Sequence, residues 1–462
     1  MLNHPPRNRD DVTAVIKAYD VRGVVGQAAD GGLDADFVRD TGASFGRLMR
    51  EEGATRVVVG HDMRDSSPEL STAFIEGVTS QGLDATRLNL TSTDELYYAS
   101  GVMDCPGAMF TASHNPAKYN GIKLCRAGAK PVGQGSGLEK IVEDLVAGVP
   151  SFDGDSGSVD EKDVLAGYAD YLLNLVPMDT RKLTVAVDAG NGMGGLTVPA
   201  VFEKLPVDLK PLYFELDGNF PNHEANPLDP KNLVDLQKYT VDTGADLGIA
   251  FDGDADRCFI VDELGEAVSP STICAMIAER YLEQHPGATI IHNLITSKSV
   301  PELVEEQGGK AVRTRVGHSF IKAKMAETGA VFGGEHSAHY YFSDFFNADS
   351  GMLAALYVLA TLGAQDKPLS ELKQKYQRYE ASGEINSEVA DQKASTEAVV
   401  AAFADRTDST DDMDGVTVEL TDGSWFNVRA SNTEPLLRLN VEARTKADVD
   451  AIVDEALAHI RG

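Results

Sequence analysis

One pattern occurs three times along this 462-residue chain and constrains its fold more than any other feature. In each case an apolar run typical of a buried strand ends in small polar residues and is followed by a helix-like stretch. The apolar runs cover residues 56–60, 183–187 and 288–291, and the polar residues after them begin at His61, Asp188 and His292. Such alternation predicts α/β layers with largely parallel sheets, and its spacing predicts three domains of similar build.

The segments between and after these patterns support that division. Residues 151–160 are rich in Gly, Ser and Asp, which is typical of a solvated connector, and helical spacing of apolar residues resumes at Leu165. The end of the chain differs, because three strand-like runs precede a single amphipathic helix that carries Val449, Ile452 and Ile460 on one face. This part predicts a smaller α+β domain bounded by an acidic loop at 405–414.

The net charge limits the partners. Asp and Glu number 72 against 41 Lys and Arg, which gives a formal net charge of −31. A surface of this sign repels nucleic acid and anionic membranes, so we expect neither as a partner. It also repels a phosphorylated substrate, which would need basic groups gathered locally. The simplest explanation of the charge itself is a well-solvated surface.

The cysteines and the apolar segments indicate a cytoplasmic protein. The four cysteines lie far apart without the spacing of a metal site, as expected for buried thiols in a reducing compartment. The first residues contain no apolar signal segment, and the uncharged run 351–364 is too short to span a bilayer. We expect that run to form a buried helix.

Ser113 is a candidate nucleophile in the segment 111–123. The apolar residues 108–110 lead into this segment, and Pro116 and Gly121 keep it from being helical. A serine displayed on such a loop can attack a phosphoryl group if another group activates it. The alternative is that Ser113 and His114 are ordinary turn residues.

Asp252, Asp254 and Asp256 stand at alternate positions between two apolar runs. Three carboxylates this close repel one another unless they bind a cation, and hard oxygen ligands suit Mg²⁺ or Ca²⁺. A calcium-binding loop would need glycine at its sixth position, where this chain has Arg257. Magnesium with a neighbouring arginine favours phosphoryl transfer.

The segment 333–340 offers groups for a sugar. Glu335 and Ser337 can hydrogen-bond sugar hydroxyls, and His339 is a candidate proton carrier. The alternative is a polar turn between two strands.

A fourth segment, 429–433, resembles an anion-binding turn. It combines a guanidinium with neutral donors from Arg429, Ser431, Asn432 and Thr433. The alternative is a turn capped by Ser and Asn.

These four segments, in this order, resemble the α-D-phosphohexomutase superfamily, and within it the bacterial phosphomannomutase/phosphoglucomutase members. The resemblance covers nearly the whole chain and includes residues 17–23 and 316–320. It implies a four-domain, heart-shaped α/β protein with a central cleft, in which three similar α/β domains have mixed sheets and the last domain is α+β. The implied domains are 1–158 with the phosphoserine loop, 159–262 with the metal-binding loop, 263–372 with the sugar-recognition loop and 373–462 with the phosphate-binding loop.

The resemblance also implies roles for the matched positions. Ser113 would carry the phosphoryl group and, with Asp252, Asp254 and Asp256, bind Mg²⁺. Lys123 and His339 would be the acid and base, with Arg257 and His318 nearby. As a base, Lys123 needs a lowered pKa, which a neighbouring cation such as Arg257 would provide. The substrate-binding residues would be Tyr19, Arg22, Glu335, Ser337, Arg429, Ser431, Asn432 and Thr433.

The implied reaction interconverts mannose 6-phosphate and mannose 1-phosphate through a phosphoserine enzyme and a hexose 1,6-bisphosphate, which also serves as primer. The protein would be a monomer or weak homodimer. Some dual-specificity relatives carry a lysine earlier in the loop that contains Lys298, so the role of Lys298 stays open.

The alternative functions within the superfamily are those of a phosphoglucomutase, a dual-specificity enzyme or a phosphoglucosamine mutase. Outside the superfamily, the rivals are a phosphatase phosphorylated on Asp252 and a non-catalytic binding protein.

Overall fold

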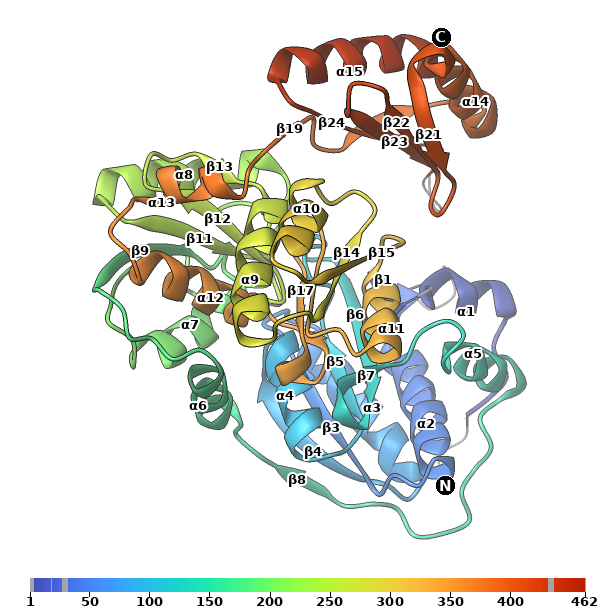
Figure 1. Cartoon of the computed structure of the whole chain (residues 1–462). Helices are drawn as coiled ribbons and strands as arrows, with labels where there is room; N and C mark the ends of the chain where they lie inside the picture. Colours follow the sequence, from blue (N-terminus) through green and yellow to red (C-terminus); the bar gives the residue numbers. More distant parts are fainter. Residues whose placement is uncertain (1–3, 18, 27–31, 431–435, 462) are drawn as a thin grey trace. The chain divides into compact units, whose positions relative to one another are not determined.

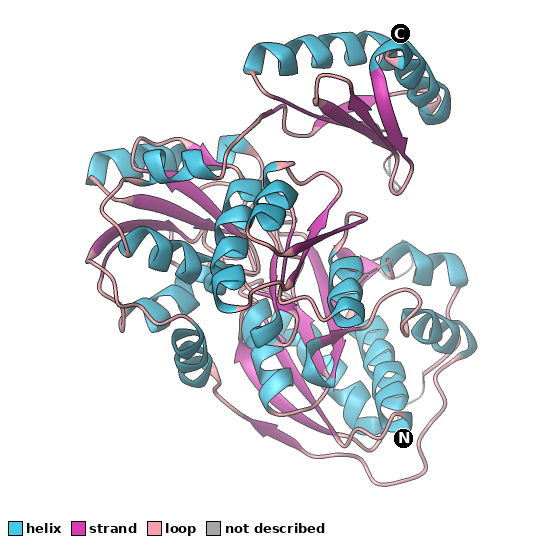
Figure 2. Ribbon diagram, in the orientation of Figure 1, coloured by secondary structure: helices cyan, strands magenta, loops and turns pink. Residues whose placement is uncertain are grey.

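The computed structural model describes residues 4–17, 19–26, 32–430 and 436–461 (Figure 1). It contains two compact units, one formed by Met1–Val268 with Ser337–Ser370 and the other by Ser269–His336 with Glu371–Gly462. Helices cover the sheets in both units (Figure 2).

An eight-stranded mixed sheet organises the first part of unit one. The strand order is β2-β1-β6-β5-β3-β4-β8, and β7 pairs with β6. The strands β3, β4, β5 and β8 run parallel, whereas β6 is antiparallel to β1 and β5. The strand bounds are β1 Val21–Val25, β2 Gly32–Leu33, β3 Arg56–His61, β4 Asp84–Leu90, β5 Gly107–Phe110, β6 Tyr119–Arg126, β7 Lys130–Pro131 and β8 Val159–Glu161.

Helices pack on both faces of this sheet because its central strands are apolar on both sides. Val57 and Val59 belong to the core beneath α2, α3 and α5, while Val58 belongs to the separate core that includes Leu96 of α4. This alternation follows from the period of two along a strand. The helices are α1 Arg9–Val15, α2 Ala35–Glu51, α3 Ser67–Ser80, α4 Thr93–Val102 and α5 Leu138–Ala147.

A five-stranded sheet follows in unit one, with the order β10-β9-β11-β12-β13. Strand β9 is parallel to β10 and β11, and the hairpin β11–β12 is antiparallel. The elements of this region are α6 Leu165–Leu175, β9 Leu183–Asp188, α7 Gly194–Phe202, β10 Val207–Leu212, α8 Val234–Thr243, β11 Leu247–Phe251, β12 Cys258–Asp262 and β13 Ala267–Val268. Unit one also contains β17 Tyr340–Phe342, β18 Ala348–Asp349 and the buried helix α12 Gly351–Gly363.

Unit two contains a parallel group of strands and a C-terminal sheet. Strand β14 lies between β15 and β16 and is parallel to both. The C-terminal strands are antiparallel in the order β19-β24-β23-β22-β21, and β20 pairs with β24. The elements are α9 Pro270–Gln284, β14 Thr289–Asn293, α10 Ser299–Glu306, β15 Lys310–Thr314, α11 His318–Thr328, β16 Phe332–Gly334, β19 Glu380–Ala381, β20 Ile385–Glu388, α14 Gln392–Ala402, β21 Thr407–Asp411, β22 Val416–Leu420, β23 Trp425–Ala430, β24 Leu436–Ala443 and α15 Lys446–Ile460.

Most of the expected elements are confirmed, with two corrections. The three apolar runs form β3, β9 and β14, and the uncharged run forms α12. The first sheet is mixed rather than largely parallel, because the hairpin β5–β6 reverses the chain. The acidic segment 405–414 is not a loop throughout, since it contains β21, which pairs with β22 beyond the segment.

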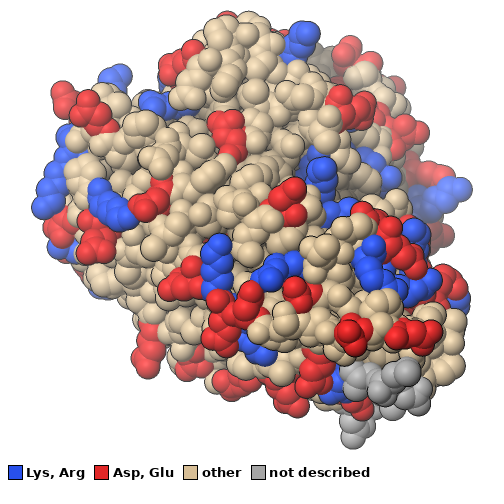
Figure 3. Space-filling view, turned by 90° about the horizontal axis from the view of Figure 1, so that it is seen from below, with Lys and Arg blue, Asp and Glu red and all other residues tan. Residues whose placement is uncertain are grey.

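Three further observations concern surface and environment. Acidic and basic side chains are interspersed over the face shown in Figure 3. No helix in the described ranges is long and apolar enough to cross a bilayer. The four cysteines are buried and form no disulfide.

Candidate active site

Ser113 lies three residues beyond the end of β5, in a strained backbone conformation. Its φ of 49° falls in the left-handed region, which residues other than glycine rarely adopt. The Ser113 backbone N–H donates to Thr111 Oγ1 at 2.9 Å, and only 6% of the residue is exposed. This conformation directs the Ser113 hydroxyl to the loop between β11 and β12, where its Oγ donates to Asp252 Oδ2 at 2.8 Å.

The loop between β11 and β12 holds three buried carboxylates. Oxygens of Asp252, Asp254 and Asp256 lie within 4.8 Å of one another, and each residue is at most 1% exposed. Within the described chain, Oδ1 of Asp254 and Oδ1 of Asp256 accept no hydrogen bond. Buried carboxylate oxygens without donors are unfavourable unless a cation binds them. The set therefore fits a hard divalent cation such as Mg²⁺.

The two loops meet backbone to backbone at Gly253. A Cβ placed on Gly253 would lie 2.4 Å from the carbonyl oxygen of Ser113. Only glycine permits this approach. Residues 139 positions apart in the sequence are thereby brought into hydrogen-bonding distance.

Lys123 and Arg257 supply positive charge to the carboxylates. Lys123, on β6, donates from Nζ to Asp254 Oδ2 at 2.6 Å and to Asp256 Oδ2 at 2.5 Å. Arg257 donates from its backbone N–H and from Nε to Asp252, at 3.1 and 2.9 Å.

The expectation of a lowered Lys123 pKa is wrong for this arrangement. Burial alone would lower the pKa of Lys123, but the carboxylates of Asp254 and Asp256 outweigh it and raise the pKa well above its usual value. For Asp252, burial raises the pKa to about 7 against the opposing effect of Arg257.

Two histidines lie at this site in different surroundings. His114 Nδ1 is 3.2 Å from Ser113 Oγ and 2.8 Å from Arg257 Nη2. Burial, and then Arg257, lowers the pKa of His114 to about 2, which favours the neutral imidazole. His339 forms a β-bridge with Arg257, and its Nδ1 lies 3.1 Å from Asp349 Oδ2 and 3.9 Å from Asp256 Oδ1.

Three more of the predicted residues lie in unit one. Arg22, on β1, donates to Asn115 Oδ1 at 2.7 Å, which attaches it to the Ser113 loop, and to Asp20 Oδ2 at 2.5 Å. Tyr19 is half-buried just before β1, and Ser337 is half-buried three residues before β17.

Unit two contains the remaining predicted residues. Glu335 is 2% exposed and accepts hydrogen bonds from Asn293 Nδ2 at 3.2 Å and from the backbone N–H of Gly317 at 3.1 Å. His318 begins α11. Lys298 donates from Nζ to Glu419 and to the carbonyl of Gly423.

Arg429 lies on β23, directly opposite Arg438 of β24. It forms ion pairs with Glu384 at 3.3 Å and with Asp414 at 3.7 Å. The other predicted members of the cradle, Ser431, Asn432 and Thr433, lie outside the described residues.

The sequence interpretation missed three residues that contact this site. Thr93 begins α4 and donates from Oγ1 to Asp254 Oδ2 at 2.5 Å and from its backbone N–H to the Asp254 carbonyl at 3.1 Å. Asp349 holds His339, and Arg64 donates to the carbonyl of Ser113. The capping box formed by Ser92 and Glu95 is readable in the sequence as a helix start, but it does not reveal where the helix points.

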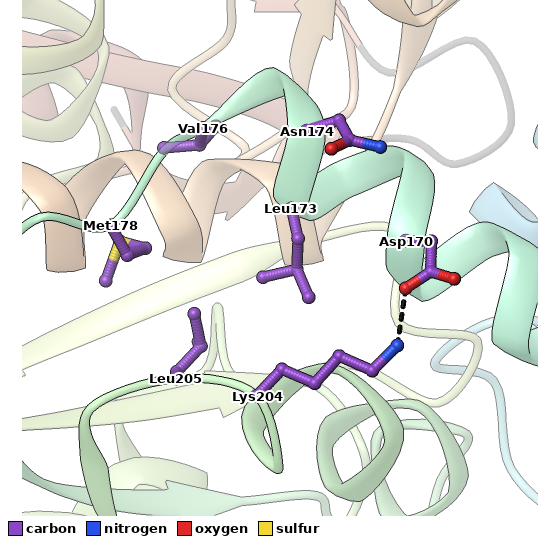
Figure 4. A pocket seen from close by; sticks show the side chains of 7 residues that line it. All are labelled: Asp170, Leu173, Asn174, Val176, Met178, Lys204 and Leu205. Atoms are coloured by element: carbon purple, nitrogen blue, oxygen red, sulfur yellow. Dashed lines mark hydrogen bonds and ion pairs between the residues drawn. The ribbon is translucent and has the colours of Figure 1, made fainter.

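A surface hollow of about 480 Å³ lies beside α6, in another part of unit one (Figure 4). It is lined by Asp170, Leu173, Asn174, Val176, Met178, Lys204 and Leu205, and Lys204 forms an ion pair with Asp170. None of these residues belongs to the loops described above, so the hollow carries no argument about catalysis.

Comparison with known proteins identifies the family. Models of the phosphoglucomutase/phosphomannomutase family match domain I at residues 13–147, domain II at 166–265, domain III at 269–379 and the C-terminal domain at 384–459. The chain belongs to the phosphoglucomutase/phosphomannomutase family. It is accordingly a phosphohexomutase, an isomerase with the four-domain architecture expected from its sequence.

Relatives match this family member over nearly their full length. A phosphomannomutase from Salmonella montevideo is 38% identical over 439 residues, which cover 93% of this chain and 94% of that protein. A phosphoglucomutase from Neisseria gonorrhoeae is 35% identical over 450 residues, with 95% of each chain covered. A crystal structure of a phosphoglucomutase/phosphomannomutase family protein from Burkholderia thailandensis has a TM-score of 0.88 and 32% identity, and covers 97% of both chains.

The close approach at Gly253 gives a test of the two-loop arrangement. We expect Gly253→Ala to reduce mutase turnover at least ~100-fold, because the new Cβ pushes the Ser113 loop away from the carboxylates and small misplacements slow such reactions strongly. Gly194→Ala is the matched control, since a Cβ there meets its nearest neighbours at 3.4 Å, an ordinary contact. Steady-state assays of both purified variants measure the turnover. Wild-type turnover by Gly253→Ala would contradict the role of the close approach at Gly253.

Proposed function

We propose that this phosphohexomutase interconverts mannose 6-phosphate and mannose 1-phosphate through a phosphoserine at Ser113 and a hexose 1,6-bisphosphate intermediate. The observation that carries the proposal is the contact of Ser113 Oγ with a buried cluster of three carboxylates, two of which have oxygens without donors. A hydroxyl and a cation site at this distance meet the needs of phosphoryl transfer, which depends on positioning and charge neutralisation.

The relatives support a proposal for the sugar preference. Phosphomannomutases from Salmonella and Escherichia coli are 37–38% identical to this chain. The phosphoglucomutase from Neisseria gonorrhoeae is 35% identical. We therefore propose mannose phosphates as the main substrates and glucose phosphates as the second candidate.

Asp252, Asp254 and Asp256, together with the Ser113 oxygen, would hold Mg²⁺. Bound there, the ion supplies neutralisation of the negative charge on the transferring phosphoryl group. Arg257 and Lys123 add positive charge beside it, so the local balance of charge differs from that of the whole chain.

In the proposed transfer, the free sugar hydroxyl attacks the phosphorus of phosphoserine 113. The bond from phosphorus to the sugar oxygen forms, and the bond to Ser113 Oγ breaks. We assign the base role on the sugar hydroxyl to His339, which Asp349 holds at 3.1 Å. We assign the acid role to Lys123, because its carboxylate neighbours keep it protonated. The second transfer reverses these steps with the other phosphate of the bisphosphate.

The remaining residues would bind the substrate. We propose that Glu335 and Ser337 bind secondary hydroxyls of the sugar, with His318 nearby, and that Tyr19 and Arg22 line the site around the phosphoserine. The non-reacting phosphate would be bound by Arg429, Ser431, Asn432 and Thr433. A hexose 1,6-bisphosphate would prime the dephosphorylated enzyme. We also propose a cytoplasmic location, which suits four buried thiols that form no disulfide.

Replacing the nucleophile tests the proposed function. We expect Ser113→Ala to lose more than ~99.9% of mutase turnover, because the variant lacks the hydroxyl proposed to carry the phosphoryl group. Wild-type enzyme incubated with mannose 1,6-bisphosphate should gain the mass of one phosphoryl group on the peptide that contains Ser113. Assays on mannose, glucose and glucosamine 1-phosphates should show the highest kcat/KM with mannose. Retained activity in Ser113→Ala, with accumulation of inorganic phosphate, would instead indicate a phosphatase.

Magnesium binding gives a second, independent test. At a Mg²⁺ concentration about 100 times its Kd, binding should stabilise the fold by ~2.7 kcal/mol and raise the midpoint of thermal unfolding. We expect this increase to disappear in Asp254→Asn. The matched control is Asp246→Asn. Asp246 directly precedes β11, whereas the three aspartates follow its C-terminal end, and Asp246 forms an ion pair with Arg181. An equal increase in the wild type and in Asp254→Asn would exclude the aspartate site.

A further inference from the structure

We propose that Arg64 is a positioning residue for phosphoryl transfer, which fixes the backbone of the Ser113 loop so that the Ser113 hydroxyl faces Asp252. This inference rests on the proposed phosphoserine chemistry and extends it to a residue outside the four motifs. Arg64 lies three residues after the end of β3 and is 1% exposed.

Every N–H group of the Arg64 side chain has an acceptor. Nη2 donates to the carbonyls of Ser113 and Asn115 at 2.8 and 2.7 Å. Nη1 donates to the carbonyls of Pro116 and Tyr119, both at 3.0 Å. Nε donates to Asp62 Oδ2 at 3.1 Å, so all five donors of the guanidinium are used. A fully engaged, buried guanidinium is not available to bind a substrate phosphate.

Arg64 is itself held firmly in place. Asp62 Oδ1 accepts hydrogen bonds from the Arg64 backbone N–H at 3.1 Å and from Ser67 Oγ at 2.7 Å. The Phe220 ring lies 5.2 Å from the guanidinium carbon. A Cβ on Gly218 would be only 2.7 Å from Arg64 Cα, so the chain packs closely over the arginine. The guanidinium is therefore a rigid attachment point.

The Ser113 loop needs such an attachment point. It belongs to no helix or strand ladder from Thr111 to Lys118, and within the described chain the carbonyls of Ser113 and Asn115 accept no backbone N–H. An unpaired buried carbonyl is unfavourable, and so is the left-handed conformation of Ser113. By binding three carbonyls of this loop and that of Tyr119 at the start of β6, Arg64 stabilises the conformation in which Ser113 Oγ lies 2.8 Å from Asp252 Oδ2.

The direct test is Arg64→Lys, which keeps the charge beside Asp62 but has three donors in place of five. We expect kcat to fall by ~100-fold with KM changed less than ~3-fold, because the misplaced hydroxyl affects the transfer and not the binding of the sugar. The rate at which mannose 1,6-bisphosphate phosphorylates Ser113, measured by quenched-flow intact mass, should fall in parallel.

The matched control is Arg50→Lys. Arg50 also donates to a backbone carbonyl, that of Gln81 at 2.6 Å, and its guanidinium lies 4.0 Å from the Phe152 ring centroid. Gln81 follows the C-terminal end of α3, whereas Arg64 precedes its N-terminal end, so ~20 Å of helix separates the two contacts. We expect wild-type kcat and KM in Arg50→Lys.

The outcomes separate this role from a purely structural one. If Arg64→Lys lowers the unfolding midpoint while the folded enzyme keeps wild-type kcat, or if KM rises at unchanged kcat, the positioning role is refuted. If Arg64→Lys does not fold, Asp62→Asn retains the arginine and should lower kcat ~10-fold by loosening it, and unchanged kcat would again refute the role. Absence of wild-type turnover on all three hexose phosphates would refute the proposed function itself.

Discussion

The hydrogen bond from Ser113 Oγ to Asp252 Oδ2 joins two loops that come from different sheets, and the arrangement of the site depends on it. Two buried features make this contact possible. Gly253 removes the side chain that would separate the loops, and Arg64 fixes the carbonyls of the Ser113 loop. Thr93 at the start of α4 also donates to Asp254 twice, from its hydroxyl and from its backbone N–H. The site is thus built from rigid elements, as phosphoryl transfer requires.

Charge at the site differs from charge on the rest of the molecule. The chain carries a formal net charge of −31, yet Arg22, Lys123 and Arg257 all contact the Ser113 loop or the carboxylates. This is the local gathering of basic groups that an anionic substrate needs in an acidic protein. The same groups shift the pKa values at the site: Asp254 and Asp256 raise the pKa of Lys123 against the effect of burial, whereas burial, and then Arg257, lowers the pKa of His114. A protonated Lys123 acts more naturally as an acid than as a base.

The sequence predicted the strands better than it predicted their contacts. Apolar runs ending in polar residues predicted β3, β9 and β14, because burial requires such runs whatever the neighbours are. The segment 405–414 was predicted as a loop from its acidic composition, but pairing with β22 and the ion pair of Asp411 with Arg313 overrode that preference. Arg64 was missed because its contacts with the Ser113 loop are all to backbone carbonyls, which leave no pattern in side-chain identities. The role of Thr93 depends on where α4 points, which only the tertiary structure reveals.

The proposed site would hold one metal ion between the Ser113 oxygen and the three aspartates. A crystal structure of the wild-type enzyme grown with Mn²⁺ tests this most directly, since the anomalous signal locates the ion without ambiguity. We predict a single strong peak coordinated by Asp252, Asp254, Asp256 and the oxygen of Ser113 or of its phosphate. A peak elsewhere, or an empty carboxylate cluster with Ser113 turned away from it, would contradict the account.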